Sequence, residues 1–256
     1  MLEVSRLRAT VKSSSPAGGA EKEILKGVDF SIGANETVVL LGRNGAGKST
    51  VASCLMGNPK FKVSGSARFL GKNLLKLSPD KRAKLGLLMT FQNPVEIHGV
   101  STTEIVRASM EEKKKGFVPI DKVREKILEN GTENVWFYER EANVGFSGGE
   151  KKKNEIALTL ALRPKLLILD EIDSGLDLDS SEEISKILEK YQRETGCSYL
   201  IISHNLRVLR HLKVDKVILI EKGSVYMTSD AGLVKRVEKE GIRAILNEVS
   251  LERGAI

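Results

Sequence analysis

Short apolar runs separated by turn residues recur along the chain and predict the strands of a sheet. The run Leu166–Leu169 is continuously apolar and is bounded by a turn, which is typical of a strand buried on both faces. The runs Thr37–Leu41, Leu87–Phe91 and Tyr199–Ser203 are interpreted as strands as well. Further strands are predicted at Leu2–Val11, Val28–Ile32, Ser66–Leu70, Lys216–Glu221 and Ser224–Met227.

The pattern changes to charged helices between Gln92 and Leu166. Helices are predicted at Thr103–Lys114 and Asp121–Glu129, and a third begins after Ser147. Strands on both sides of a helical stretch predict an α/β fold in which the helical part is inserted into the strand-rich part.

Glycines and a lysine follow the run Thr37–Leu41 in the order G-x-x-x-x-G-K-S, and a helix is predicted at Lys48–Met56. Such glycines let backbone N–H groups point at a polyphosphate, and the following helix aims its positive dipole end at the same anion. Lys48 is expected to reach the β and γ phosphates, Ser49 to hold Mg²⁺, and Thr50 to contact phosphate. The alternative is a glycine-rich turn without a ligand. The nucleotide-binding set is Gly42, Arg43, Asn44, Gly45, Ala46, Gly47, Lys48, Ser49 and Thr50.

Two carboxylates, Asp170 and Glu171, end the strand at Leu166–Leu169. Ligands bind at the carboxyl ends of parallel strands in open α/β sheets, so both side chains are expected at the nucleotide. Asp170 is predicted to hold Mg²⁺ through water, and Glu171 to act as the general base that polarises the attacking water. The alternative is that they cap the next helix.

The sequence Phe146-Ser147-Gly148-Gly149-Glu150 begins an amphipathic helix whose three lysines, Lys151, Lys152 and Lys153, are expected to face solvent. Ser147 is a good N-cap, and the glycines after it leave backbone N–H groups bare. This helix end is therefore predicted to bind a second anion.

These motifs resemble those of the ABC ATPase family, with FSGGE where many members have LSGGQ. The resemblance implies a catalytic and Mg²⁺-sensing role for Gln92, a D-loop at Ser174–Asp177 with Asp177 as its acidic residue, and a switch histidine at His204 that contacts the γ phosphate. An ordinary loop histidine is the alternative for His204. It also implies that Ser147, Gly148, Gly149 and Glu150 act in trans on the ATP of a second copy.

The resemblance implies a P-loop NTPase of ABC type with a mixed sheet core, an inserted helical subdomain and an N-terminal antiparallel β region. The expected division is an ATP-binding core of residues 1–92 and 165–256 and a helical subdomain of residues 93–164. The expected cofactors are ATP and Mg²⁺, with Ser49, Gln92 and Asp170 at the metal. ATP binding is expected to bring two copies together transiently.

Three longer segments resemble the SufC branch of this family, the ATPases of the Suf iron–sulfur cluster assembly system. They are FQNPVEIHGVS at 91–101, VGFSGGEKKKNEI at 144–156 and LDEIDSGLDLDS at 169–180. This resemblance implies that the partners are SufB and SufD, or a SufB-like homologue, whose scaffold is remodelled by ATP-driven dimerisation. A partner-docking groove is expected at Pro94, Val95, Ile97 and Val100, with packing inside the helical subdomain as the alternative.

Three other functions remain open at this stage. They are the nucleotide-binding subunit of a membrane ABC transporter, a non-enzymatic ATP-gated scaffold and an ABC ATPase of DNA repair. The carboxylate Glu171 argues against the scaffold, and the absence of a coiled-coil or zinc insert argues against DNA repair.

Composition sharpens this picture. The formal net charge of +7 suggests nucleic acid, but the runs Lys113–Lys115 and Lys151–Lys153 are not interleaved with aromatic residues, so nucleic-acid binding is not expected. Apolar runs fall short of the roughly 18 residues that a membrane span needs, so membrane insertion is not expected and a cytoplasmic location is. Cys54 and Cys197 lack metal-ligand spacing and are expected to be buried.

The segment Ser13–Ala20 is rich in small residues and is predicted to be a flexible hairpin loop. ABC proteins usually present an aromatic residue to adenine in this region, whereas here the nearest candidate is Val11. Without an aromatic face, adenine is expected to be held by apolar contact alone.

Overall fold

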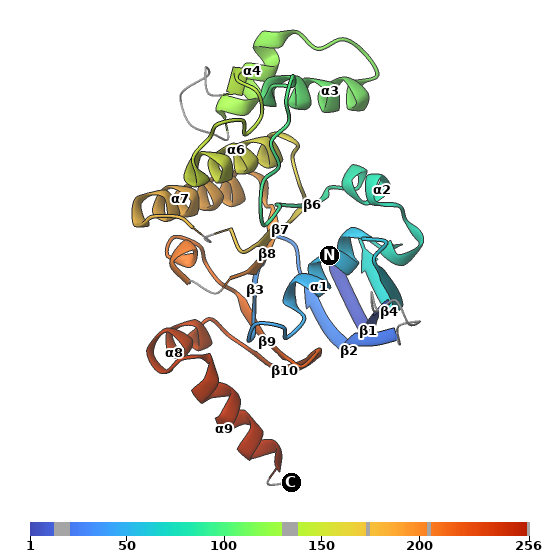
Figure 1. The fold of residues 1–256 in the computed structure, drawn as a ribbon, viewed down its shortest axis with the longest axis vertical. Helices are drawn as coiled ribbons and strands as arrows, with labels where there is room; N and C mark the ends of the chain where they lie inside the picture. Colours follow the sequence, from blue (N-terminus) through green and yellow to red (C-terminus); the bar gives the residue numbers. More distant parts are fainter. Residues whose placement is uncertain (13–20, 130–137, 173–174, 204–205, 255–256) are drawn as a thin grey trace.

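The computed structural model describes residues 1–12, 21–129, 138–172, 175–203 and 206–254. It contains a mixed six-stranded sheet and an antiparallel four-stranded sheet (Figure 1). A layer of helices is formed by the part of the sequence that connects β6 (Leu87–Met89) to β7 (Leu166–Asp170). The segment 13–20, for which a flexible loop is predicted, lies outside the described residues.

The six-stranded sheet has the strand order β10-β9-β3-β8-β7-β6. Neighbours pair in parallel except for β9 and β10, which form an antiparallel edge. The strands are β3 (Thr37–Leu41), β6 (Leu87–Met89), β7 (Leu166–Asp170), β8 (Ser198–Ile202), β9 (Lys216–Glu221) and β10 (Ser224–Ser229).

The four-stranded sheet has the order β2-β1-β4-β5 and is antiparallel throughout. Its strands are β1 (Leu2–Lys12), β2 (Glu21–Ile32), β4 (Phe61–Phe69) and β5 (Lys72–Asn73). The predicted N-terminal antiparallel β region is therefore present.

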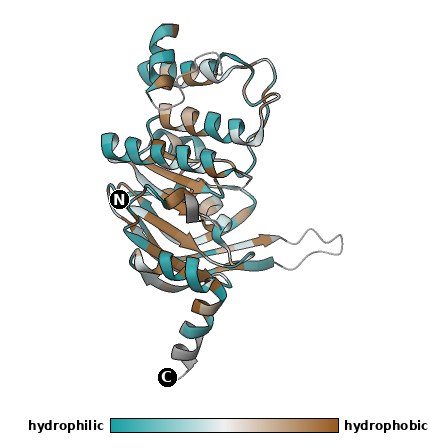
Figure 2. Cartoon of the chain, turned by 90° about the vertical axis from the view of Figure 1, so that its left-hand side faces the viewer, coloured by the Kyte–Doolittle hydropathy of each residue, from teal (hydrophilic) through white to brown (hydrophobic). Residues whose placement is uncertain are grey.

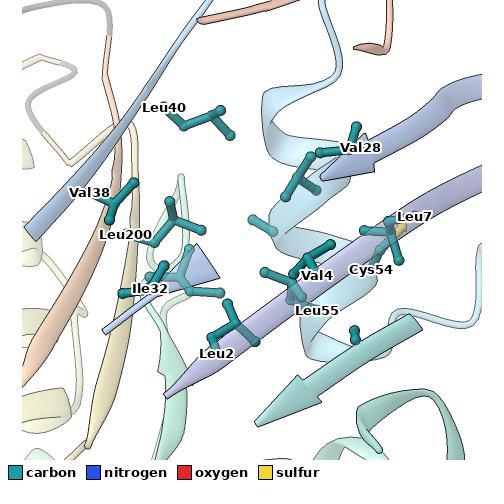
Figure 3. Packing of buried hydrophobic residues seen from close by; sticks show 14 of the residues in the cluster. Leu2, Val4, Leu7, Val28, Ile32, Val38, Leu40, Cys54, Leu55 and Leu200 are labelled. Atoms are coloured by element: carbon teal, nitrogen blue, oxygen red, sulfur yellow. The ribbon is translucent and has the colours of Figure 1, made fainter. Parts of the chain in front are cut away.

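Alternate residues of the parallel strands enter two separate hydrophobic clusters, because successive side chains of a strand point to opposite faces. In β3, Val38 and Leu40 join the cluster that packs against α1 (Lys48–Met56) and the antiparallel sheet (Figure 3). Val39 and Leu41 join the cluster beneath α6 (Gly148–Ala161) and α7 (Leu178–Thr195) on the other face. Both faces of β3 are thus covered, and the loop after Leu41 starts from a rigid strand.

Helices cover both faces of the large sheet, with hydrophobic strands inside and hydrophilic helix faces outside (Figure 2). A third cluster joins α3, α4 and α6 away from the sheet. The helices are α1 (Lys48–Met56), η1 (Leu74–Lys76), α2 (Pro79–Lys84), α3 (Thr102–Lys114), α4 (Ile120–Leu128), α6 (Gly148–Ala161), α7 (Leu178–Thr195), η2 (Leu206–Leu209), α8 (Gly232–Glu240) and α9 (Ile242–Gly254). Within the residues described, none of these helices has both the length and the apolar character needed to cross a membrane.

A buried arginine of α2 closes the end of α1. The Arg82 guanidinium donates hydrogen bonds to the carbonyl oxygens of Cys54 and Leu55, at 2.8 and 2.7 Å, and to that of Leu77 at 2.9 Å. Carbonyls at a helix C-terminus lack partners within the helix, so a cation there is favourable. Burial nevertheless lowers the pKa of Arg82. The helix that follows the phosphate loop is therefore fixed at its far end.

Several predicted boundaries need correction. β2 begins at Glu21 rather than Val28, because its polar first half pairs along β1 in spite of its exposure. The strand predicted at Leu87–Phe91 ends at Met89, because the chain then turns away from the sheet. Helix α2, which the sequence analysis missed, was signalled by a proline in its first turn.

Candidate functional site

The loop between β3 and α1 is packed so closely that its glycines are required. A Cβ atom at Gly42 would lie 2.3 Å from the carbonyl oxygen of Ile220, and one at Gly47 would lie 2.9 Å from Leu25. Gly47 also has a φ of 109° at the N-cap of α1, where it has no side chain to cap the first N–H groups. Around Gly45, by contrast, a Cβ would meet only open space. The open side at Gly45 leaves room for a phosphate at the N-terminus of α1.

Lys48 is buried beneath this loop and closes it. Its ammonium group donates hydrogen bonds to the carbonyl oxygens of Gly42, at 2.9 Å, and Arg43, at 3.1 Å. Burial lowers the pKa of Lys48, and the carboxylates of Glu171 and Asp170 oppose that effect. The ammonium therefore lies between the loop backbone and the two carboxylates that end β7.

Ser49 and Asp170 bring two hard oxygen ligands together. The Ser49 hydroxyl donates to Asp170 Oδ1 at 3.1 Å, from the first turn of α1 to the end of β7. Burial raises the pKa of Asp170, and the hydrogen bond from Ser49 partly offsets this. Hydroxyl and carboxylate oxygens are ligands that Mg²⁺ prefers, so this pair fits a magnesium ion beside a phosphate.

Glu171 and Gln92 meet at the same end of the sheet. The Gln92 side-chain amide donates to Glu171 Oε2, although the two residues are far apart in sequence. Glu171 has a φ of 51°, in the left-handed region, and its own amide donates to the carbonyl oxygen of Ile202 at 2.8 Å. The turn after β7 therefore directs Glu171 across to the segment that follows β6.

The glycine-rich start of α6 packs beside the start of α7. Ser147 and Glu150 form a capping box, in which each side chain accepts a hydrogen bond from the other residue's amide. A Cβ at Gly149 would lie 3.4 Å from Ser180 Oγ, so this helix end adjoins the start of α7. Among the residues described, no hydrogen bond or ion pair joins Ser147–Glu150 to Gly42–Thr50.

Asp177 is the N-cap of α7 and accepts a hydrogen bond from the Ser180 amide at 2.7 Å. This contact lowers the pKa of Asp177. Two other predicted residues, Ser174 and His204, lie outside the described residues. The structure thus brings together Lys48, Ser49, Gln92, Asp170 and Glu171, and it places the start of α6 beside the start of α7.

One expectation about α6 is wrong. Lys152 is buried and not exposed to solvent, with only 4% of its surface accessible, and it donates to the carbonyl oxygens of Phe91 and Gln92. Lys151 and Lys153 are half-buried and pair with Glu96 and Glu183. Lys151 and Lys152 face the chain that follows β6, whereas Lys153 faces α7.

Other residues around the site were not predicted from the sequence. Glu155, on α6, is buried beside Lys152, and Glu221 lies 4.0 Å from the half-exposed Arg43 of the phosphate loop. Val11 lies opposite Phe61 of β4, an aromatic residue on the same face of the antiparallel sheet. Only spacing along α6 could have signalled Glu155, three positions after Lys152.

A phosphate loop between β3 and α1, with two carboxylates at the end of a nearby parallel strand, defines a P-loop NTPase. Comparison with known proteins narrows the class. A family model described as ABC transporter matches residues 25–174, more than half of the chain. The chain belongs to the ABC ATPase family, so it is an ATPase and binds ATP.

Relatives and solved structures agree with this assignment. A probable ABC transporter ATP-binding protein of Streptococcus pyogenes serotype M3 is 38% identical over 98% of this chain and 97% of its own length. The chloroplastic ABC transporter I family member 6 of Arabidopsis thaliana is 38% identical over 96% of this chain and 73% of its own length. A dimeric structure of the ATP-binding cassette MJ0796 bound to ADP and Pi, with 24% identity, superposes with a TM-score of 0.77 over 90% of this chain and 98% of that one. The predicted fold class is therefore confirmed.

Proposed function

We propose that this chain is the ATP-hydrolysing subunit of an iron–sulfur cluster assembly complex of the SufBCD type. One observation supports this most directly. Two of the three segments that carry the resemblance to SufC, 91–101 and 144–156, contact each other through their own polar side chains. Lys151 pairs with Glu96 at 2.7 Å, and Lys152 holds the backbone of Phe91 and Gln92.

Buried side-chain amides extend the contact between these two segments. The Asn154 side chain donates to Asn143, at 2.9 Å, and Asn143 donates to the carbonyl oxygen of Val95 at 2.8 Å. Thr102 donates to Asn154 from the other side, at 2.8 Å. Buried amides need such partners, so each of these residues depends on the others. The branch-specific residues therefore form one structural unit.

Within the nucleotide site we propose the following roles. Lys48 and the loop amides of Gly42–Thr50 hold the phosphates, and Ser49, Asp170 and Gln92 hold Mg²⁺. Glu171 orients and deprotonates the attacking water, and His204 contacts the γ phosphate. A bound magnesium ion would neutralise charge that develops on the phosphate oxygens.

A lone copy supplies only part of this site. We propose that Ser147, Gly148, Gly149 and Glu150 act on the nucleotide of a second copy, with Asp177 beside them. The exposed start of α6 supports this arrangement, because among the described residues it makes no hydrogen bond or ion pair to its own phosphate loop. ATP binding would then bring two copies together and hydrolysis would release them, which changes the spacing of whatever is docked on them. The boundary of the moving helical subdomain is proposed at residues 93–164.

The docking surface for SufB or SufD is proposed on the segment after β6. Phe91, Val95 and Ile97 are exposed apolar side chains, with Val95 at 64% exposure. Pro94 and Val100 are half-buried. Exposed apolar side chains gathered on one short segment are typical of a surface that a partner covers.

The test is affinity capture of the tagged chain after co-expression with SufB-like and SufD-like proteins. Val95→Asp places a charge on the proposed surface and should abolish capture while leaving ATP binding unchanged. Phe117→Asp is the matched control, because Phe117 is 79% exposed on the segment between α3 and α4. Equal capture by both variants would contradict the proposed surface, and failure of the unaltered chain to bind either protein would contradict the proposed function.

The second candidate is the nucleotide-binding subunit of a membrane ABC transporter. The relatives named as transporter ATP-binding proteins favour it. Capture from detergent-extracted membranes separates the two functions, because recovery of a multispanning permease would favour transport and leave the ATPase site as it is described above.

A further inference from the structure

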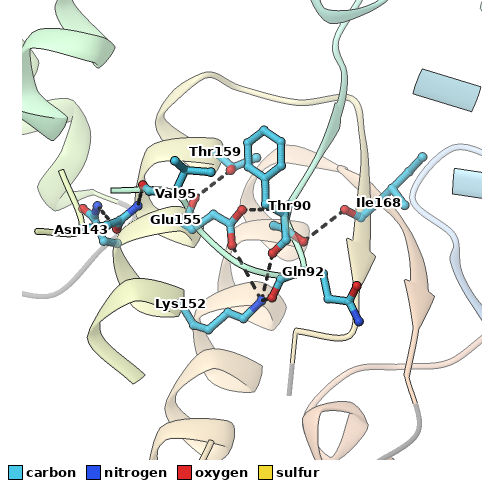
Figure 4. Close-up of polar contacts among 10 residues, drawn as sticks. Thr90, Gln92, Val95, Asn143, Lys152, Glu155, Thr159 and Ile168 are labelled. Carbon is cyan, nitrogen blue, oxygen red and sulfur yellow. Dashed lines mark hydrogen bonds and ion pairs between the residues drawn. The ribbon is translucent and has the colours of Figure 1, made fainter. Parts of the chain in front are cut away.

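Directly after β6, the hydrogen bonds of the backbone change from β7 to α6. The amide of Thr90 donates to the carbonyl oxygen of Ile168 in β7 at 3.0 Å, and its hydroxyl approaches the same oxygen at 3.5 Å. Residue 90 therefore still hydrogen-bonds to β7, although β6 itself ends at Met89. From Phe91 onward the backbone is held by α6 (Figure 4).

Two side chains of α6 hold this backbone. The Lys152 ammonium donates to the carbonyl oxygens of Phe91, at 2.9 Å, and Gln92, at 2.8 Å. Glu155 Oε1 accepts a hydrogen bond from the Phe91 amide. Three backbone groups of this short stretch are thereby fixed to one turn of α6, because residues three apart on a helix lie on the same face (Figure 4).

Stability alone does not account for this pair. Lys152 and Glu155 are 4% and 5% exposed, and their charged atoms are 4.0 Å apart. Glu155 Oε2 has no hydrogen-bond partner among the described residues, and burial raises the pKa of Glu155 to about 7. A buried ion pair often stabilises a fold less than well-packed apolar residues of similar volume. Burial of these two charged side chains costs folding free energy. Because the cost falls one residue from Gln92, it indicates a functional role for the pair.

We propose that Lys152 and Glu155 are positioning residues for Gln92. They fix the Gln92 backbone to the helix that begins with Ser147-Gly148-Gly149, while the Gln92 side chain reaches Glu171 at the end of β7. Displacement of α6 relative to the sheet would therefore move Gln92 toward or away from the carboxylates.

This inference rests on the role proposed above for Gln92, and the first variant tests the connection. Lys152→Met keeps the length of the side chain but removes its donors. It should lower kcat about 10-fold, as loss of residues that orient a metal ligand commonly does, with ATP affinity unchanged. Lys152→Arg should recover most of the activity, because a guanidinium can donate to both carbonyls.

Lys153→Met is the matched control. Lys153 lies on the same helix but pairs with Glu183 of α7 and makes no contact with Phe91 or Gln92 among the described hydrogen bonds. Its kcat should stay within about 2-fold of the unaltered chain. An equal loss in both variants would overturn the proposal, since it would mark a general effect of removing charge from α6.

A double-mutant cycle decides whether Lys152 acts through Gln92. Gln92→Ala should lower kcat by itself, and adding Lys152→Met should then cost less than about 2-fold more. Full additivity would overturn the inference and leave the role of Gln92 standing. Normal turnover of Gln92→Ala would instead contradict the role proposed for Gln92, and the inference with it.

Glu155→Gln keeps the proposal testable if Lys152→Met does not fold, as judged by circular dichroism. The amide oxygen of glutamine can still accept from Phe91, so the variant removes the charge that faces Lys152 and preserves the shape. We expect a smaller loss of kcat in the same direction, with ATP affinity unchanged. Unaltered kcat in this variant would overturn the role of Glu155.

Discussion

The phosphate loop and the start of α6 are both glycine-rich helix N-termini, yet the molecule holds them in different ways. Gly42 and Gly47 have so little space that a methyl group would collide with Ile220 or Leu25. Gly148 has open space, since the nearest atom to an added Cβ is the Gly175 carbonyl oxygen at 4.0 Å. The first site is completed by backbone packing, whereas the second is an open surface held by long polar side chains.

This difference between the two helix N-termini fits the different roles proposed for them. A site that must bind phosphate within one chain gains from a rigid cradle that is formed before the ligand arrives. A site that acts on another copy, as proposed for the start of α6, needs an exposed surface and a support that can shift. Side-chain ion pairs on α6 provide such a support, since they tolerate small displacements that close packing does not.

The largest effect is expected from replacing Glu171, the carboxylate that accepts a hydrogen bond from Gln92. Glu171→Gln preserves shape but removes the base, so kcat should fall about 10²- to 10⁴-fold while ATP still binds. The variant should accumulate as an ATP-bound dimer, which sedimentation velocity with and without ATP would reveal. Near-normal turnover in a steady-state ATPase assay would remove Glu171 as the base.

Loss of the buried ammonium should be the next largest effect. Lys48→Ala removes a charged donor from the cradle and should weaken ATP binding about 10- to 100-fold, as measured by calorimetry. Ser53→Ala, in the same helix, is the control and should bind ATP normally. Unchanged affinity of Lys48→Ala would refute the assignment of the cradle.

A pair of matched glycine variants would test the comparison directly. Gly42→Ala should lower the free energy of unfolding by about 1–3 kcal/mol, because the added methyl group has no space. Gly148→Ala should leave it unchanged or slightly raised, because alanine favours the helix. If α6 meets a second copy, Gly148→Ala should still reduce ATP-dependent dimerisation. Urea denaturation and sedimentation separate the two effects, and equal loss of stability in both variants would contradict the comparison.

The smallest effect concerns pH. Burial raises the pKa of Glu155 from its ordinary 4.5 to about 7, so the folded chain binds this proton more tightly than the unfolded chain does. The contribution of Glu155 to stability should therefore be largest below about pH 4.5 and should be lost as the pH rises through about 7. Urea midpoints at pH 5 and pH 8 should differ less in Glu155→Gln than in the unaltered chain. An identical difference in both would show that Glu155 does not titrate in this range.

The same contrast explains what could be predicted from the sequence. The cradle depends on glycine and lysine at fixed spacing after an apolar strand, so the pattern of Gly42–Lys48 was enough to predict its strand and helix. Lys152 was predicted to face solvent as one of three consecutive lysines. Nothing nearby in the sequence shows that the chain after β6 crosses α6, the helix that carries Lys152. Burial of a polar side chain by a distant segment depends on tertiary packing, which local patterns do not reveal.

The exposed side chain of Phe91 makes the same point. An apolar residue that ends an apolar run is expected to belong to the strand, but β6 ends at Met89 and leaves Phe91 62% exposed. The apolar pattern predicted the strand β6 correctly but placed its end at Phe91, whereas it ends at Met89. The residue that leaves the sheet is therefore exposed on the surface proposed to bind a partner.

The placement of the segment between β6 and β7 has an evolutionary consequence. β6 and β7 are neighbours in parallel register, with Leu87 opposite Leu166, so the chain departs and returns within roughly 10 Å. An insertion whose ends are this close adds little strain to the sheet whatever its length. The segment can therefore be exchanged between related chains as a module, provided that each graft brings its own Lys152 and Glu155 equivalents. Because the segment also carries Gln92 and Ser147–Glu150, such an exchange would change the proposed docking surface and part of the proposed nucleotide site together.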